Sequence, residues 1–118
     1  MEIERLNIWN LAVELAKDVY ILTEKFPKKE VYSLTDQIRR AAVSVPSNIA
    51  EGKGRSSAKD FINFLSVARG SLYELMTQLY IAREIGYLTE EDFSTFQKRI
   101  EDLSHKIIAM GKYLRNKK

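Results

Sequence analysis

The residues best suited to bind a charged ligand lie within residues 37–55. Arg39 and Arg40 are adjacent there, and Lys53 and Arg55 follow at the end of the stretch. A guanidinium group can donate two parallel hydrogen bonds to a phosphate, so such a stretch is typical of nucleic-acid contacts. These four residues and two later basic residues form the predicted nucleic-acid-binding set, which is Arg39, Arg40, Lys53, Arg55, Lys59 and Arg69.

The same arginines also have acidic neighbours, so ion pairing is the alternative interpretation. The candidate partners are Asp36, Glu51 and Glu74. Surface ion pairs contribute only about 0–1 kcal/mol to stability. Because consecutive helical residues point about 100° apart, Arg39 and Arg40 must find different partners.

Other arrangements suggest catalytic or metal sites but lack essential members. Asp102 and His105 have the spacing of a metal-ligand pair in a helical bundle, which needs a second such pair and carboxylates from other helices. Gly52, Lys53 and Gly54 follow a helix rather than a strand and lack the Ser or Thr of a phosphate-binding loop. Because His105 is the only histidine, we find no Ser/His/Asp arrangement. We therefore expect a protein that is not an enzyme and has no metal site and no cofactor.

The basic residues are unevenly distributed along a chain whose net charge is +3. Residues 39–69 contain six bases and two acids, and residues 98–118 contain seven bases and two acids. Two basic segments on an otherwise balanced chain permit nucleic-acid binding.

The composition also bears on the compartment. The absence of cysteine excludes disulfide bonds and thiolate metal sites. The N-terminus lacks a basic region followed by an apolar one, and no apolar run reaches the roughly 18 residues of a membrane helix. We therefore expect a cytoplasmic protein with no membrane partner.

Apolar residues recur at alternating steps of three and four along almost the whole chain, which is the spacing of amphipathic helices. The helix over 8–26 ends before Pro27, because the residue preceding a proline is pushed out of the helical conformation. Ser33, Ser57 and Thr89 each precede an aspartate by three residues, as in a capping box, and Gly86 ends the third segment. The predicted helices are 8–26, 33–52, 57–85 and 89–114.

Four helices of this kind on short links predict an all-α fold, an antiparallel up-down-up-down four-helix bundle. The length fits one domain, residues 1–118. Pro46 lies inside the second helix, where it removes a backbone donor and crowds the carbonyl group of Ala42. We therefore predict that the second helix is kinked at Pro46.

The third predicted helix carries a second row of large side chains beside its apolar seam. The row consists of Ile62, Arg69, Tyr73, Met76, Tyr80, Arg83 and Tyr87. It is interpretable as a broad core edge, as a subunit interface, or as a platform on which unpaired bases stack. We take the interface as the prediction, formed by Tyr73, Met76, Tyr80, Arg83 and Tyr87.

The stretch with the paired arginines also resembles a known family. Residues 37–52 read QIRRAAVSVPSNIAEG, and Gly54 and Arg55 follow. This run closely resembles the signature of the bacterial "four helix bundle protein" family, also called the intervening-sequence protein of the large ribosomal RNA gene. The resemblance covers about residues 6–90, with flanking matches at Trp9, Ala12, Leu15, Phe64, Leu65, Ala68, Gly70, Ser71 and Leu72.

The resemblance implies a four-helix bundle that assembles into a homopentameric ring, as in the related accessory protein of diversity-generating retroelements. That relative is thought to bind nucleic acid and the reverse transcriptase through a basic surface. The resemblance supplies no catalytic residue. Together with the basic segments it leads us to expect an oligomeric accessory protein that binds RNA, or else DNA. The alternative is a protein–protein scaffold that recruits a partner such as a reverse transcriptase without touching nucleic acid.

Overall fold

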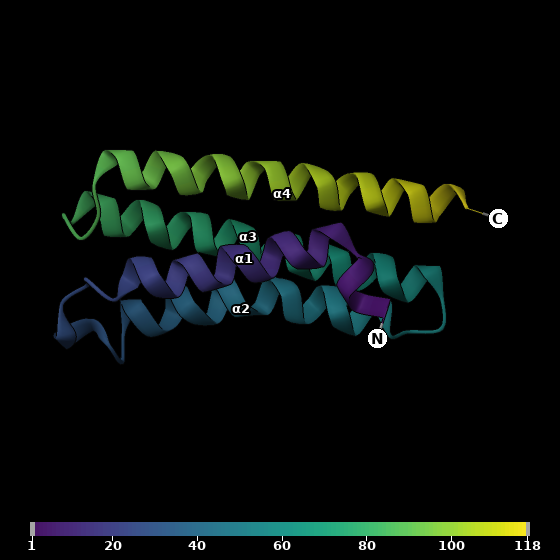
Figure 1. Cartoon of the computed structure of the whole chain (residues 1–118), viewed down its shortest axis with the longest axis horizontal. Coiled ribbons are helices and arrows are strands. Elements are labelled where there is room, and N and C mark those ends of the chain that lie inside the picture. The colour runs from purple at the N-terminus through teal and green to yellow at the C-terminus, as the bar shows by residue number, and fades with distance from the viewer. Residues whose placement is uncertain (1, 118) are drawn as a thin grey trace.

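The computed structural model describes residues 2–117, which form helices joined by short links (Figure 1). The α-helices are α1 (Asn7–Thr23), α2 (Leu34–Lys53), α3 (Ala58–Glu84) and α4 (Glu90–Asn116). The short 3₁₀ helices η1 (Glu2–Arg5) and η2 (Lys28–Glu30) precede α1 and α2. No strand occurs in residues 2–117, so the predicted all-α class is confirmed. Met1 and Lys118, the ends of the predicted domain, lie outside the described residues.

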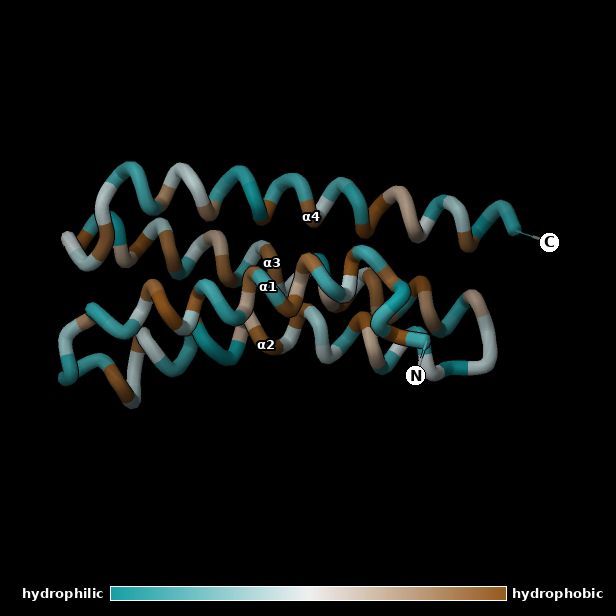
Figure 2. Tube along the Cα trace, viewed as in Figure 1, coloured by the Kyte–Doolittle hydropathy of each residue, from teal (hydrophilic) through white to brown (hydrophobic). Residues whose placement is uncertain are grey.

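The predicted apolar rows form the core. Ile38 and Ile49 of α2 and Leu75 and Leu79 of α3 are fully buried. Figure 2 shows the same pattern on α4, whose hydrophobic positions lie on the side toward α3 while its outer side is hydrophilic. Full burial of one such side chain stabilises the fold by about 1.5–3 kcal/mol. No helix within residues 2–117 is both long and apolar enough to cross a membrane.

The end of the first helix differs from the prediction. We expected helix up to Phe26, but α1 ends at Thr23. Phe26 is still buried and reaches the core from the connecting loop. Pro27 accounts for part of this difference, because it excludes Phe26 from the helical conformation. Thr23 is the last residue of α1, and its hydroxyl donates a hydrogen bond to the carbonyl oxygen of Val19 at 2.8 Å.

Two of the predicted helix caps and the predicted glycine end are confirmed. The hydroxyl oxygens of Ser57 and Thr89 accept hydrogen bonds from the third backbone N–H along the chain, at 3.1 and 3.0 Å. Gly86 has a φ of +86° and ends α3. The N–H of Tyr87 reaches back to the carbonyl oxygen of Ala82 at 2.8 Å, as in a Schellman motif.

The third predicted cap is wrong. Ser33 precedes α2, but its side chain accepts no capping hydrogen bond. Its backbone, with φ of −131° and ψ of −110°, lies outside the extended region from which a capping side chain reaches into the first turn. The backbone N–H of Leu34 instead donates to the carboxylate of Glu30 at 3.4 Å.

Helix α2 runs through Pro46 without a break. The proline ring is buried. The predicted kink stays a prediction, since the missing N–H and the crowding at Ala42 still favour a local bend.

Each helix packs mainly beside the next one in the chain, which gives the predicted up-down-up-down order (Figure 1). The contact between α1 and α4, which closes the bundle, is the least extensive of the four neighbouring contacts. An ion pair from Arg99 to Asp18 at 2.9 Å supports it, and Lys25, in the loop after α1, pairs with Asp92 of α4 at 2.6 Å. The molecule is a rod of 49 × 23 × 20 Å.

Candidate nucleic-acid interface

Arg39 is folded onto the first helix. Its Nε donates to the hydroxyl of Thr23 at 2.8 Å, and Nη2 donates to the backbone carbonyl oxygen of Tyr20 at 3.3 Å. The guanidinium also lies over the Tyr20 ring, 4.7 Å from its centroid. We expected an acidic partner for an arginine that does not contact phosphate. That expectation is wrong for Arg39, which is instead held by a hydroxyl, a carbonyl group and an aromatic face.

Arg40 points elsewhere, as expected for consecutive residues of a helix. Its Nε donates to the carboxylate of Asp36 at 2.9 Å. The side chain of Arg40 is 77% exposed, so this predicted ion pair is a weak surface contact that leaves the guanidinium open to ligands.

The small polar residues of the signature are used inside the bundle. The hydroxyls of Ser44 and Ser71 lie 2.8 Å apart across the contact between α2 and α3. The side-chain amide of Asn48 donates to the carbonyl oxygen of Ser44 at 2.8 Å. These contacts explain Ser44 and Asn48 by helix packing rather than by ligand binding.

The turn between α2 and α3 carries the other basic residues of the signature. Arg55 pairs with Glu51 at 3.0 Å and lies over the ring of Phe64, 4.8 Å from its centroid. Lys53 and Lys59 are exposed on either side of this turn. Among residues 2–117 neither lysine has an ion-pair partner, so both ammonium groups are available to a ligand.

Gly52 lets the two helices meet closely at this turn. A Cβ atom at this position would lie 2.8 Å from Phe61 Cδ1 and 2.8 Å from Phe64 Cβ. The sequence pattern placed Gly52 at the end of a helix and did not reveal this packing role. The signal was the pair of phenylalanines at the start of the next helix.

The second basic segment reaches the same end of the molecule. Because α4 is antiparallel to α3, its C-terminus lies at the end where the α2–α3 turn lies (Figure 1). Lys112, Arg115 and Lys117 are exposed there. We call this set the basic end: Lys53, Arg55, Lys59, Lys112, Arg115 and Lys117.

The structure does not bring all of the predicted nucleic-acid-binding residues together. Arg39 and Arg40 lie about 20 Å along α2 from Lys53, at 1.5 Å per residue. Arg69 lies about three turns into α3 and is half-buried, with an Nε atom that is buried and has no hydrogen-bond partner in residues 2–117. Of the predicted set, only Lys53, Arg55 and Lys59 lie at the basic end.

Part of the predicted interface row is used within the chain. Arg83 pairs with Glu90 at 3.0 Å and lies 4.3 Å from the centroid of the Phe93 ring. The hydroxyl of Tyr87 donates to the carboxylate of Glu30 at 2.6 Å.

These contacts shift the pKa values of Glu30, Tyr87 and Arg83. The hydrogen bond from Tyr87 lowers the pKa of Glu30, against the opposing effect of burial, and the same bond raises the pKa of Tyr87. Burial opposes the charge of Arg83, but the carboxylates of Glu90 and Glu84 outweigh it and raise the pKa of that guanidinium. Arg83 and Tyr87 of the predicted interface therefore have partners within one copy of the chain.

The rest of the row remains open to a partner. Tyr73 is 60% exposed and Tyr80 is 49% exposed. Tyr73 and the half-buried Met76 border a groove of about 500 Å³ between α3 and α4, together with Ile108 and His105. Tyr80 packs its ring edge-on against Phe93, so it serves the bundle as well as the surface.

Asp102 and His105, which have the spacing of a metal-ligand pair, make no such pair in the structure. Asp102 accepts hydrogen bonds from Lys106 at 2.9 and 3.1 Å, and His105 is exposed. In residues 2–117 no three His, Cys, Asp or Glu side chains gather as a metal ion would require.

The fold and its surface define an antiparallel four-helix bundle with one basic end. The family model described as the 23S rRNA-intervening sequence protein matches residues 4–109, so the chain belongs to this family. It is also similar to a protein of unknown function from the S23 ribosomal protein family of Bacteroides thetaiotaomicron, whose crystal structure superposes with a TM-score of 0.79 at 22% sequence identity. The match covers 89% of this chain and 98% of that one, and it shows the shared fold. A comparison with curated proteins finds no match.

Proposed function

We propose that the protein is a non-enzymatic, oligomeric accessory protein that binds RNA through its basic end. The observation that carries this proposal is that three bases of the first basic segment and three of the second lie at one end of the rod. Clustered lysines and arginines provide the electrostatic contact with phosphates that dominates nucleic-acid affinity. The family description also refers to 23S rRNA.

Helix stability explains some of these charges but not all of them. Lys53 and Arg115 lie in the last turns of α2 and α4, where a cation stabilises the helix dipole. Lys59 lies in the first turn of α3, where the dipole disfavours a cation. A phosphate group of a bound ligand would offset the unfavourable interaction of the Lys59 ammonium group with the dipole of α3.

The proposed assembly is a ring of identical chains, with five as the number that the family resemblance implies. The exposed part of the α3 row, Tyr73, Met76 and Tyr80, would supply the contact between copies. A ring would repeat the basic end around its axis, and repeated weak phosphate contacts gain affinity through effective concentration.

The test measures binding of a fluorescent single-stranded RNA across a salt series, with light-scattering mass on the same preparation. The double variant Lys53→Gln, Lys59→Gln should bind more weakly. If both lysines contact phosphates, the slope of log affinity against log salt should fall in magnitude by about 1.4, since each contact contributes about 0.7. The matched control is Lys17→Gln, Lys29→Gln, which removes the same net charge from exposed lysines elsewhere.

Equal losses in the two double variants would contradict the proposal, because the binding would then follow net charge rather than a site. An assembled wild-type protein that ignores RNA and DNA at low salt would also contradict it. That second result would favour the scaffold that recruits a protein such as a reverse transcriptase.

A further inference from the structure

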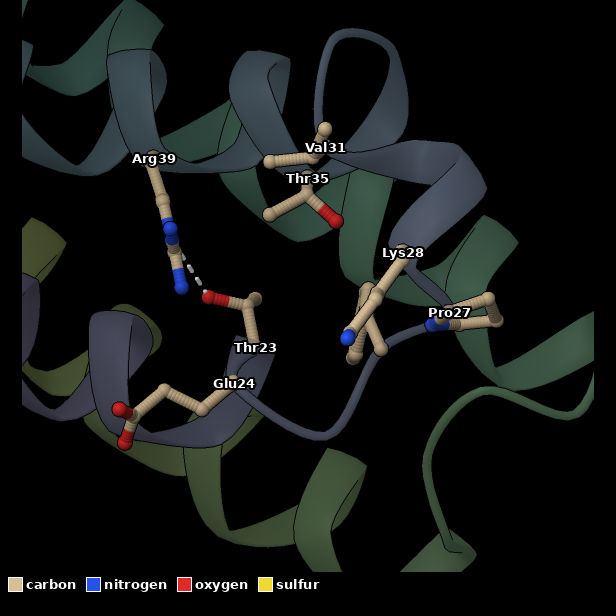
Figure 3. A pocket seen from close by; sticks show the side chains of 8 residues that line it. Thr23, Glu24, Pro27, Lys28, Val31, Thr35 and Arg39 are labelled. Atoms are coloured by element: carbon tan, nitrogen blue, oxygen red, sulfur yellow. Dashed lines mark hydrogen bonds between the residues drawn. The ribbon is translucent and has the colours of Figure 1, made fainter.

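A cavity of about 490 Å³ opens where α1 ends and α2 begins, at the end of the bundle opposite the basic end. Figure 3 shows Thr23 and Arg39 on facing walls, joined by their hydrogen bond, with Lys28 and Thr35 beside them. Pockets that hold small molecules typically measure about 300–1,000 Å³. The cavity is therefore large enough for a ligand, and it is separate from the proposed RNA surface.

The guanidinium of Arg39 is held in place at this cavity. Its contacts with Thr23 and Tyr20 fix the plane of the group through Nε and Nη2. The third nitrogen, Nη1, has no hydrogen-bond partner in residues 2–117. A preorganised arginine loses little side-chain entropy when it binds an oxyanion, so this nitrogen is free to donate a hydrogen bond to one.

Thr35 supplies an independent sign of a ligand. Its side chain lines the cavity and only 4% of the residue is exposed, yet its hydroxyl has no hydrogen-bond partner in residues 2–117. Figure 3 shows this oxygen on the side facing Lys28. An unpaired buried hydroxyl destabilises a protein, so nearly all such groups have a partner. A ligand oxygen in the cavity would provide it.

The charge around the cavity favours an anion. Lys28 has no ion-pair partner among the described residues, and Figure 3 shows its amine extending toward Thr23. The carboxylate of Glu24 also borders the cavity, but it is turned away from Lys28. Two cations therefore face the space, against one carboxylate directed outward.

We propose that this cavity binds a phosphate group, either free or as the monoester of a small molecule. Arg39 Nη1 and Lys28 Nζ neutralise its charge, and the Thr35 hydroxyl donates to one of its oxygens. A phosphate monoester carries close to two charges and three strong acceptor oxygens, which matches two cations and a hydroxyl better than a carboxylate does. The site goes beyond the proposed RNA binding and does not depend on it.

The experiment follows backbone amide NMR signals and the melting temperature while inorganic phosphate, phenyl phosphate or acetate is added at constant ionic strength. Saturable shifts at Thr35 and Arg39, with a rise in melting temperature, are expected for phosphate or its monoester, because a ligand of the native state stabilises it. Binding of the inorganic ion points to free phosphate, and binding of phenyl phosphate alone points to a monoester. Equal binding of acetate, or no saturable shift at all, would overturn the proposal.

Three variants separate a binding site from a structural role. Lys28→Gln should weaken phosphate about tenfold or more, whereas Lys29→Gln, its exposed neighbour, should leave affinity unchanged. Thr35→Val should melt higher without phosphate, because it removes an unpaired buried hydroxyl, and should show a smaller rise when phosphate is added. Equal effects of the two lysine changes, or an undiminished response in Thr35→Val, would remove phosphate from this cavity.

Discussion

Gly52 is the glycine at which an added Cβ atom would meet its neighbours most closely. Replacing it with alanine would place a Cβ 2.8 Å from Phe61 and Phe64, so one of the two helices must shift. We expect Gly52→Ala to lower the free energy of unfolding by about 1–3 kcal/mol, measured by urea denaturation.

The control for this substitution is Gly111→Ala, where an added Cβ meets nothing within 4 Å. Alanine there should stabilise α4 by about 0.5–1 kcal/mol through backbone entropy. Similar changes in the free energy of unfolding at the two glycines would show that the close approach at Gly52 does not determine stability.

The hydrogen bond between Tyr87 and Glu30 predicts a pH dependence of stability. Since it holds the pKa of Glu30 below the ordinary 4.5, its contribution is present above pH 4.5 and is lost as the pH falls through the lowered value. Since the pKa of Tyr87 lies above the ordinary 10.0, the contribution is present below pH 10 and is lost as the pH rises through the raised value.

Tyr87→Phe should therefore be less stable than the wild type near neutral pH, and the gap should narrow towards both extremes. The measurement is the free energy of unfolding as a function of pH for the two proteins. A gap that stays constant with pH would mean that the lost hydroxyl acts through packing alone.

Local contacts of single residues were predictable, whereas distant ones were not. The pairs of Arg40 with Asp36 and of Arg55 with Glu51 span one helical turn, so spacing alone revealed them. The partner of Arg39 is Thr23, 16 residues away in another helix, and only the packing of α1 on α2 creates that contact. The sequence did not indicate that Thr35 and Lys28 line one cavity, because only the packing of the chain brings them together.

At the scale of the elements, the caps offer a matched comparison. Ser57 accepts a hydrogen bond from the first turn of α3, and Ser33, before α2, does not. We expect Ser57→Ala to cost about 1 kcal/mol of stability and Ser33→Ala to cost clearly less, measured by thermal and urea unfolding. Equal costs would mean that Ser33 caps α2 in solution.

Apolar spacing predicted the helices well because every α-helix here buries one continuous row. It failed at the loop before α2, since Phe26 continues the row without continuing the helix. The failed cap at Ser33 has a similar cause. Its backbone N–H donates to the carbonyl oxygen of Glu30, the last residue of η2, at 2.9 Å, and a pattern of residue types does not reveal that contact.

For the whole molecule, the proposed ring predicts a change of mass on altering one exposed tyrosine. Tyr73→Glu should give folded monomers, because it places a charge at the centre of the proposed contact. Tyr113→Glu is the control, since Tyr113 on α4 is similarly exposed and lies outside the row. Light scattering and circular dichroism together distinguish loss of assembly from unfolding, and a Tyr73→Glu protein of unchanged mass would contradict the interface.

The site was less predictable from sequence than the fold. The two basic segments were visible as composition, but their meeting at one end follows only from the antiparallel order of α3 and α4. The predicted set also mixed residues of both ends, because Arg39 and Lys53 are close in the signature and about 20 Å apart along the helix.

The order of the helices around the bundle also has a consequence for folding speed. Within residues 2–117 most tertiary contacts join helices that are consecutive in the chain, and the modest α1–α4 contact joins the first helix to the last. Chains whose contacts are local lose little loop-closure entropy before those contacts form. Such chains typically fold within about microseconds to milliseconds. We expect the α2–α3 hairpin, which has the most extensive contact, to form the folding nucleus, so that a newly made chain gains its native centre before α4 has been synthesised.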